Sequence, residues 1–244
     1  MDPTGISSTI QGWLRDYATR AGATGYVVGL SGGIDSACTA VLCHRAVSGN
    51  LLAAILPCEG PASDIEMALL LANTFAIKTI TIDLAPVYRA AVTSLPPGLS
   101  QLATANLKPR LRMATLYALA QTNGYLVAGT GNKSEIAVGY FTKYGDGGVD
   151  LEPLGDLYKS QVRLLARELS IPQPIIDRPP SAGLWPGQTD EDEMGLTYDQ
   201  LDRTLIAIEQ GDTDQVEPAL LHRVQQMMAA SDHKRKLPPI CLIP

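Results

Sequence analysis

The chain has 244 residues, enough for one large α/β domain, and its 45% of hydrophobic residues support a sizeable core and argue against disorder. Its formal net charge of −6 gives no general basic field, so we expect no nucleic-acid partner, and a small anionic substrate would need local positive groups. The apolar runs are short, as in Leu51–Leu56, and none approaches the roughly 20 residues of a membrane span, so no membrane segment is expected.

The N-terminal stretch and the cysteines are typical of a cytoplasmic protein. The first residues include Asp2 and lack an apolar core, so we expect no signal peptide. The four cysteines form no C-x-x-C pair, and with only three histidines the spacing of a metal site is absent; they are Cys38, Cys43, Cys58 and Cys241. Reduced thiols and a cytoplasmic location are therefore expected.

Strand and helix patterns alternate through the first half of the chain. A first helix, Ile6–Tyr17, places its apolar residues on one face. The pattern then predicts strands at Tyr26–Leu30, Leu51–Leu56, Thr79–Ile82 and Tyr125–Gly129, and helices at Ser36–Val47, Asp64–Phe75, Pro86–Ser94 and Thr104–Thr122. Short, continuous, β-branched strands are typical of a parallel sheet that helices cover on both faces. We therefore predict an α/β fold with a doubly wound parallel sheet and with ligands at the C-terminal ends of its strands.

The second half of the chain is less regular. The chain has no clean period after Lys143 until a predicted helix at Asp156–Leu169. The segment Ile171–Gly195, with five prolines and three glycines, also lacks a period, and a long loop of this kind is usually functional, often a lid. Helices are predicted at Tyr198–Glu209 and Gln215–Ala229. We expect a single domain over residues 1–244 with a C-terminal helical part at about 196–244.

The most informative stretch is S-G-G-I-D-S at Ser31–Ser36, between the strand Tyr26–Leu30 and the next helix. Backbone N–H groups at a helix N-terminus, approached through glycines without a Cβ, suit a phosphate group. The loop matches neither the Walker A pattern nor the G-x-G-x-x-G pattern of dinucleotide folds. The order S-G-G-x-D-S resembles the pyrophosphate loop of the N-type ATP pyrophosphatases. An ordinary glycine-rich β–α turn is the plainer alternative.

Further motifs resemble one family of these enzymes, the NAD synthetases. The decapeptide G-Y-F-T-K-Y-G-D-G-G at Gly139–Gly148 is close to a motif of that family. Five more segments, in the family's order, resemble its motifs: Asn106–Met113, Gly129–Glu135, the loop segments Pro179–Trp185 and Gln188–Glu191, and His233–Arg235. Two departures stand out. Pro109 replaces a small residue and moves the expected helix start to about Lys108, and Cys58–Pro61 lacks the family's serine/tyrosine-rich segment, which leaves the adenine-side contacts open.

The resemblance implies a Rossmann-like ATP pyrophosphatase fold, of the adenine nucleotide alpha hydrolase-like type, and a ligase of NAD biosynthesis. In the implied reaction, the carboxylate of deamido-NAD (nicotinic acid adenine dinucleotide) attacks the α-phosphorus of ATP. Pyrophosphate leaves, and ammonia then displaces AMP from the acyl-adenylate. The resemblance also implies Mg²⁺, a homodimer with the dinucleotide at its interface, and no glutaminase domain.

The same resemblance assigns residues to the site. Asp35, Lys159 and Glu135 are the expected catalytic residues, and Asp35 and Glu135 are the expected Mg²⁺ ligands, since hard carboxylate oxygens suit this cation. The expected ATP-binding residues are Gly29, Ser31, Gly32, Gly33, Asp35, Ser36, Thr130, Lys159 and Ser181. The expected substrate-binding residues are Asn106, Arg110, Lys143, Asp146, His233 and Lys234.

Several of these residues also fit a plainer structural role. An acid such as Glu135 is favourable at a helix N-terminus in any case. Lys159 fits a solvated surface lysine as well, although a cation in the first turn of a helix opposes the helix dipole by about 0.3–1 kcal/mol. In the plainer alternative, Asp146 does no more than shape a turn, and the charges of the basic tail are simply solvated.

One helical stripe is ambiguous between an interface and the core. Met113 and Tyr117 share a stripe with Asn106 and Arg110, which fits a site at a subunit interface or plain core packing. The neighbouring stripe is expected in the core; its members are Leu107, Leu111, Ala114 and Ala118.

Two other functions remain open. One is an ATP pyrophosphatase that amidates a different substrate, as GMP synthetase does, and the Gly139–Gly148 segment argues against it. The other is a non-catalytic nucleotide-binding relic. A relic tends to lose its metal ligands first, so the presence of Asp35, Glu135 and Lys159 favours the enzyme.

Overall fold

The computed structural model describes residues 2–185 and 187–243 of the chain. Its centre is a parallel sheet of four strands in the order β3-β2-β1-β4. The strands are β1 (Gly25–Gly29), β2 (Leu51–Ile55), β3 (Thr79–Thr81) and β4 (Tyr125–Ala128). In this register Tyr26 of β1 pairs with Leu51 on one side and Leu126 on the other. The strand order therefore reverses at β1, and the crevice beyond its C-terminal end is the expected place for a ligand.

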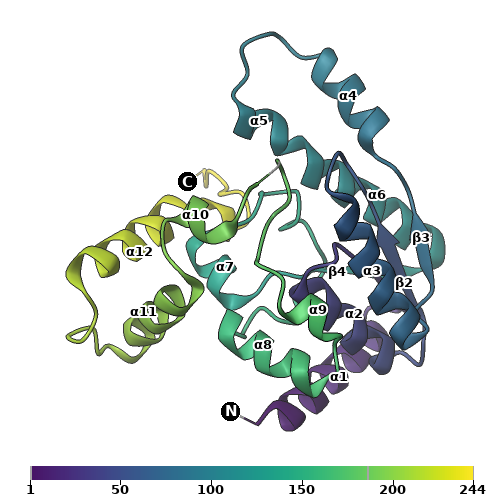
Figure 1. The fold of residues 1–244 in the computed structure, drawn as a ribbon, viewed down its shortest axis with the longest axis horizontal. Coiled ribbons are helices and arrows are strands. Elements are labelled where there is room, and N and C mark those ends of the chain that lie inside the picture. Colours follow the sequence, from purple (N-terminus) through teal and green to yellow (C-terminus); the bar gives the residue numbers. More distant parts are fainter. Residues whose placement is uncertain (1, 186, 244) are drawn as a thin grey trace.

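Helices cover both faces of the sheet, as predicted (Figure 1). One face packs against α1 (Pro3–Arg20), α2 (Ile34–Ala46), α3 (Ala62–Phe75) and α8 (Lys159–Glu168). The other packs against α4 (Ala85–Thr93) and α6 (Leu107–Asn123), and a short α5 (Gln101–Ala105) precedes α6. The central strands β1 and β2 are continuous apolar runs because both of their faces are buried, whereas the edge strand β3 is half-buried to exposed. None of the helices in the described part of the chain is long and apolar enough to cross a membrane.

A second apolar cluster joins the C-terminal helices to the rest of the fold. It involves α7 (Lys133–Val138), α10 (Asp190–Met194), α11 (Tyr198–Gln210) and α12 (Pro218–Ala230). Val138 of α7 packs there with Leu201 and Val224. In Figure 1, α10, α11 and α12 lie on one side of the sheet-bearing body, and α11 and α12 pack against α7. The chain then makes one turn of 3-10 helix at Asp232–Lys234 and continues as a tail without regular structure.

Three predictions need correction. The helix expected at Thr104–Thr122 is two helices that meet at Asn106, and α6 has Pro109 in its first turn, where the missing N–H costs least. The helix expected from Asp156 begins only at Lys159. The loop expected at Ile171–Gly195 contains two short helices, α9 (Gln173–Ile176) and α10.

The stripe expected in the core of α6 is also partly wrong. Ala114 and Ala118 are exposed, and Leu107 and Leu111 are only half-buried. Met113 and Tyr117 are half-buried as well. Burial along α6 therefore does not separate an interface stripe from a core stripe.

Candidate active site

The loop Ser31–Gly33 lies where β1 ends and α2 begins, and serine hydroxyls hold its shape. The Ser36 hydroxyl donates to the Gly33 carbonyl at 3.0 Å, accepts from the Ser31 N–H at 3.2 Å and lies 3.0 Å from the Ser31 hydroxyl. Gly32 has a φ of 82°, and a Cβ there would lie 2.4 Å from the backbone oxygen of Asp64. Gly33 offers no side-chain cap to α2, so the first N–H groups of that helix are open to an anion.

Three of the predicted residues meet beside this loop. The Lys159 ammonium lies 2.5 Å from Asp35 Oδ2 and 3.0 Å from Glu135 Oε1, and Lys159 is 2% exposed. Asn132, which caps α7, donates from its side-chain amide to Asp35 Oδ1 at 2.9 Å. Three elements, α2, α7 and α8, thus bring two carboxylates and one ammonium into one cluster, which we call the Asp35–Glu135–Lys159 cluster.

Burial and mutual attraction shift the pKa values in this cluster. Burial raises the pKa of Glu135 to about 7, although the Lys159 ammonium acts against this shift. For Lys159, burial alone would lower the pKa, but the charges of Asp35 and Glu135 outweigh it and hold the pKa above its ordinary value. The lysine therefore stays charged, and Glu135 is a carboxyl group that can change its charge near neutral pH.

Two further residues of the cluster were missed by the sequence analysis. The Tyr198 hydroxyl lies 2.9 Å from Glu135 Oε1 and 3.0 Å from Asp190 Oδ2, and the Lys159 ammonium lies 4.7 Å from the centre of the Tyr198 ring. Asp190 falls inside the motif Gln188–Glu191, which could have drawn attention to it. No spacing in the sequence pairs Tyr198 with Glu135.

The segment with Ser181 crosses the end of the sheet between two cationic anchors. Arg178 lies 2.7 Å from Asp64 on α3 and donates to the Gly32 carbonyl at 3.4 Å. Lys108 on α6 is buried and donates to the Leu184 carbonyl at 2.8 Å. The Ser181 hydroxyl between them donates to the carbonyl of Gln188 at 2.7 Å. The segment from Arg178 to Leu184, here called the strap, therefore links the helix layers on both faces of the sheet.

Thr130 and Gly29, two more predicted ATP-binding residues, lie at the ends of neighbouring strands. Gly29 ends β1, and Thr130 follows β4, next to Gly131. The Gly131 N–H donates to the carboxylate of Glu152 at 2.9 Å. Burial raises the pKa of Glu152 to about 8, the Gly131 N–H opposes the shift, and the charges of Asp146 and Glu135 add to it. Glu152 lies outside the sequence motifs that indicated the site.

The predicted substrate-binding residues form a second group, whose members hydrogen-bond to the segment from Gly139 to Lys143 or to the tail. Asn106 Oδ1 accepts from the Thr142 hydroxyl at 2.8 Å, and Asp146 Oδ1 accepts from the Thr142 N–H at 3.0 Å. Arg110 donates to the Lys143 carbonyl at 3.4 Å. Asp146 thus shapes the turn after Gly139, which is the structural alternative to substrate binding that the sequence left open.

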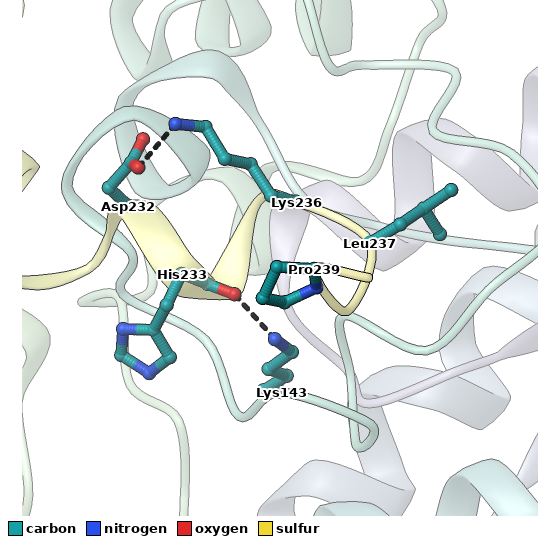
Figure 2. Close-up of a pocket in the computed structure, with 6 residues that line it drawn as sticks. All are labelled: Lys143, Asp232, His233, Lys236, Leu237 and Pro239. Atoms are coloured by element: carbon teal, nitrogen blue, oxygen red, sulfur yellow. Dashed lines mark hydrogen bonds and ion pairs between the residues drawn. The ribbon is translucent and has the colours of Figure 1, made fainter. Parts of the chain in front are cut away.

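The basic tail closes this second group. Lys234 donates to the carbonyls of Gly139 and Phe141 at 2.8 and 2.9 Å, so its ammonium holds the turn. The Lys143 ammonium donates to the His233 carbonyl, and Figure 2 shows the imidazole of His233 pointing away from that contact. Beside them is a pocket of about 250 Å³, lined by Lys143, Asp232, His233, Lys236, Leu237 and Pro239.

Asp35 and Glu135 suit a magnesium ion that phosphates help to hold. Within residues 2–185 and 187–243 there is no group of three or more His, Cys, Asp or Glu side chains that could hold a metal by themselves. Mg²⁺ is usually bound through one or two carboxylates together with substrate phosphates and water. Two carboxylates beside an anion-binding loop fit this pattern.

Comparison with known proteins agrees with this geometry. A family model described as NAD synthase matches residues 6–238. An NH(3)-dependent NAD(+) synthetase of Archaeoglobus fulgidus is 47% identical over 234 residues, which cover 95% of this chain and 94% of the relative. One from Syntrophomonas wolfei is 44% identical over 250 residues, covering 100% and 98%.

Solved structures share the fold along the whole chain. An NMN synthetase from Francisella tularensis has a TM-score of 0.91 at 42% identity, covering 100% of this chain and 99% of that one. An NH3-dependent NAD synthetase from Campylobacter jejuni has a TM-score of 0.87 at 29% identity, covering 99% and 100%. The predicted fold class is therefore confirmed, and this chain belongs to the NAD synthase family.

Proposed function

We propose that this chain is an ammonia-dependent NAD synthetase that joins ammonia to the nicotinic acid carboxylate of deamido-NAD. ATP activates the carboxylate, an acyl-adenylate forms, and AMP and pyrophosphate leave. The observation that carries the proposal is the Asp35–Glu135–Lys159 cluster beside an open helix N-terminus at the end of β1. A carboxylate is a poor electrophile, so such an enzyme acts by neutralising phosphate charge and by positioning the reactants.

ATP would lie along the C-terminal edge of the sheet. Ser31, Gly32, Gly33 and Ser36 would hold the pyrophosphate portion, since their loop leads into the open N-terminus of α2. Lys159 would face the phosphates, and Asp35 and Glu135 would hold Mg²⁺, which neutralises phosphate charge when it is bound. Gly29, Thr130 and Ser181 would complete the ATP site.

The dinucleotide would occupy the second group of residues. Asn106, Arg110, Lys143, Asp146, His233 and Lys234 would contact it, since their hydrogen bonds gather them around the segment from Gly139 to Lys143 and the tail. A single-domain chain, acting as a cytoplasmic homodimer, completes the proposal; the four free cysteines support a reducing location. Light scattering checks the dimer, since a fully active monomer would contradict it.

A second candidate substrate is nicotinic acid mononucleotide. The similarity to an NMN synthetase favours it, because NMN is the amide of that acid. Both acceptors present the same nicotinic acid carboxylate, so the activation chemistry is unchanged. They differ only in whether an adenylate half is present to be bound.

One assay separates these functions. Pyrophosphate release is measured with ATP, Mg²⁺ and ammonium, and with deamido-NAD, nicotinic acid mononucleotide or xanthosine monophosphate as the acceptor. We expect the highest kcat/KM with deamido-NAD. A higher value with the mononucleotide would support the second candidate, and a higher value with xanthosine monophosphate would support an enzyme like GMP synthetase. Release with none of the three, from folded protein that binds ATP, would indicate the non-catalytic relic.

A further inference from the structure

A buried carboxylate outside the cluster connects the C-terminal helices to it. Asp202 lies on α11 and is only 3% exposed. Its Oδ1 accepts from the Ser134 hydroxyl at 2.5 Å, and its Oδ2 accepts from the Ser160 N–H at 2.9 Å. The Ser134 hydroxyl oxygen in turn accepts from the Lys159 N–H at 3.0 Å. Both carboxylate oxygens are thus satisfied, as a buried charge requires.

These contacts complete the N-terminus of α8. The first two N–H groups of that helix belong to Lys159 and Ser160, and neither has a partner within the helix. Ser134 satisfies the first, and Asp202 satisfies the second. A negative charge at this end is also favourable to the helix dipole, which the Lys159 ammonium opposes.

The same carboxylate controls two members of the Asp35–Glu135–Lys159 cluster through their neighbours in the chain. Ser134 precedes Glu135 in α7, and Ser160 follows Lys159 in α8. Because Asp202 binds both, it fixes the start of one helix against the start of the other. The 3.0 Å contact between Lys159 and Glu135 depends on that relation.

We infer that Asp202 is a positioning residue of the ATP site, which holds Lys159 and Glu135 in place through Ser160 and Ser134. The inference rests on the proposed function, because it assumes that Lys159 faces the phosphates of ATP and that Glu135 holds the Mg²⁺ bound with them. The hydrogen bonds of the Asp202 side chain go to Ser134 and Ser160, which are the chain neighbours of Glu135 and Lys159. The C-terminal helix α11 is then part of the catalytic apparatus and not only a cover for α7.

The test compares two carboxylates on one helix. Asp202→Asn keeps the shape of the side chain and replaces one acceptor oxygen with a donor. Asp199→Asn is the matched control, because Asp199 is exposed on α11 and pairs with the exposed Arg203. We expect Asp202→Asn to lower kcat/KM for ATP by about 10–100-fold, as loss of a hydrogen bond to a charged group does. The KM of Asp202→Asn for deamido-NAD should equal that of the unmodified protein. Asp199→Asn should keep the kcat/KM for ATP of the unmodified protein.

Two further measurements separate positioning from mere stability. Calorimetric titration with ATP reports affinity without turnover, so it can test Asp202 even if none of the acceptors reacts. In a Lys159→Met background, the effect of Asp202→Asn on ATP affinity should shrink several-fold, because coupled residues are not additive. A lowered Tm with unchanged ATP affinity, or an undiminished effect in that background, would overturn the inference.

The variant Ser134→Ala covers the case in which Asp202→Asn does not fold. Ser134→Ala removes the hydroxyl between Asp202 and Lys159 but leaves the Ser160 contact. ATP affinity should fall in this variant too. Normal ATP affinity in folded Ser134→Ala would then overturn the inference.

Discussion

Lys159 occupies a position that is unfavourable on local grounds. A cation in the first turn of a helix opposes the dipole, and a buried ammonium loses its hydration. The structure offsets both costs with the charges of Asp35 and Glu135 on the side chain and of Asp202 at the helix start. Removing one of these partners is therefore expected to have a large effect, because it leaves a buried charge without compensation.

Asp35→Asn should abolish magnesium-dependent pyrophosphate release while the protein stays folded. The amide keeps an oxygen that can accept from Asn132, but it loses the charge that faces Lys159 and would face Mg²⁺. We expect turnover to fall by about 100-fold or more, as when one preorganised electrostatic group is lost. The control is Asp156→Asn, an exposed carboxylate paired with Lys133, which should behave like the unmodified protein. Near-normal turnover in folded Asp35→Asn would rule out the metal role.

Glu152 should make the stability of the protein depend on pH. Burial raises its pKa from an ordinary 4.5 to about 8, so the folded state binds this proton more tightly than the unfolded state. Between pH 4.5 and about 8 the free energy of unfolding therefore falls as pH rises, because the buried carboxyl group must become charged. The stability that the neutral carboxyl group contributes is fully present below pH 4.5 and is lost above about pH 8.

Glu152→Gln, which stays neutral, tests this dependence. Its amide oxygen can still accept from the Gly131 N–H. Relative to the unmodified protein, its Tm should rise above pH 8 by about 3–6 °C, the shift that about 1–2 kcal/mol gives in a domain of this size. The difference should vanish at low pH. Glu66→Gln, on the exposed side of α3, should show no such trend. A Tm difference that is independent of pH would contradict the burial of a charge.

At the scale of elements, local pattern predicted where strands and helices lie, and at α8 distant side chains helped to decide where the helix begins. The strand predictions differ from β1–β4 by at most one residue at each end, because β-branched and apolar runs mark these strands in the sequence. The helix predicted from Asp156 begins at Lys159 because Ser134 and Asp202, remote in sequence, satisfy its first N–H groups. A local signal is present as well, since the Gln161 side chain accepts from the Tyr158 N–H at 2.9 Å, but the local sequence does not show the two remote side chains.

The strap should be mobile until nucleotide binds, and Lys108 should restrain it. Without the Lys108–Leu184 contact, one of its two anchors is lost. In limited proteolysis, Lys108→Met should be cut between Arg178 and Leu184 several times faster than the unmodified protein, and ATP with deamido-NAD should slow cutting of the latter. Arg203→Met, which removes an exposed ion pair on α11, is the control. Equal cutting with and without substrates would refute closure.

At the scale of the whole molecule, the sequence predicted the fold and the cluster of Asp35, Glu135 and Lys159, but only part of its surroundings. Asp35 and Glu135 lie in motifs that follow the ends of β1 and β4, and a parallel sheet brings such ends to one edge. Lys159 lies in the first turn of α8, outside these motifs, and only the resemblance to the family assigned it to the site. Tyr198 and Asp202 reach the cluster from α11 through an apolar packing of helices that has no motif. The roles of the substrate-binding residues stay a prediction, since in this structure their polar groups contact the protein itself, mainly the segment from Gly139 to Lys143.

The cysteines of the chain bear on which nitrogen donor the enzyme uses, free ammonia or glutamine. Use of glutamine requires a cysteine thiolate, whose pKa is lowered by a nearby base or cation. Here burial raises the pKa of the thiols of Cys38, Cys43 and Cys58, which disfavours a thiolate in each. Cys241 lies exposed in the C-terminal tail. We therefore expect the purified chain to use free ammonia, with turnover that rises with pH below the pKa of ammonium, because neutral ammonia is the nucleophile. Turnover with glutamine as fast as with ammonium would overturn this, and its loss in Cys58→Ala would identify the thiol responsible.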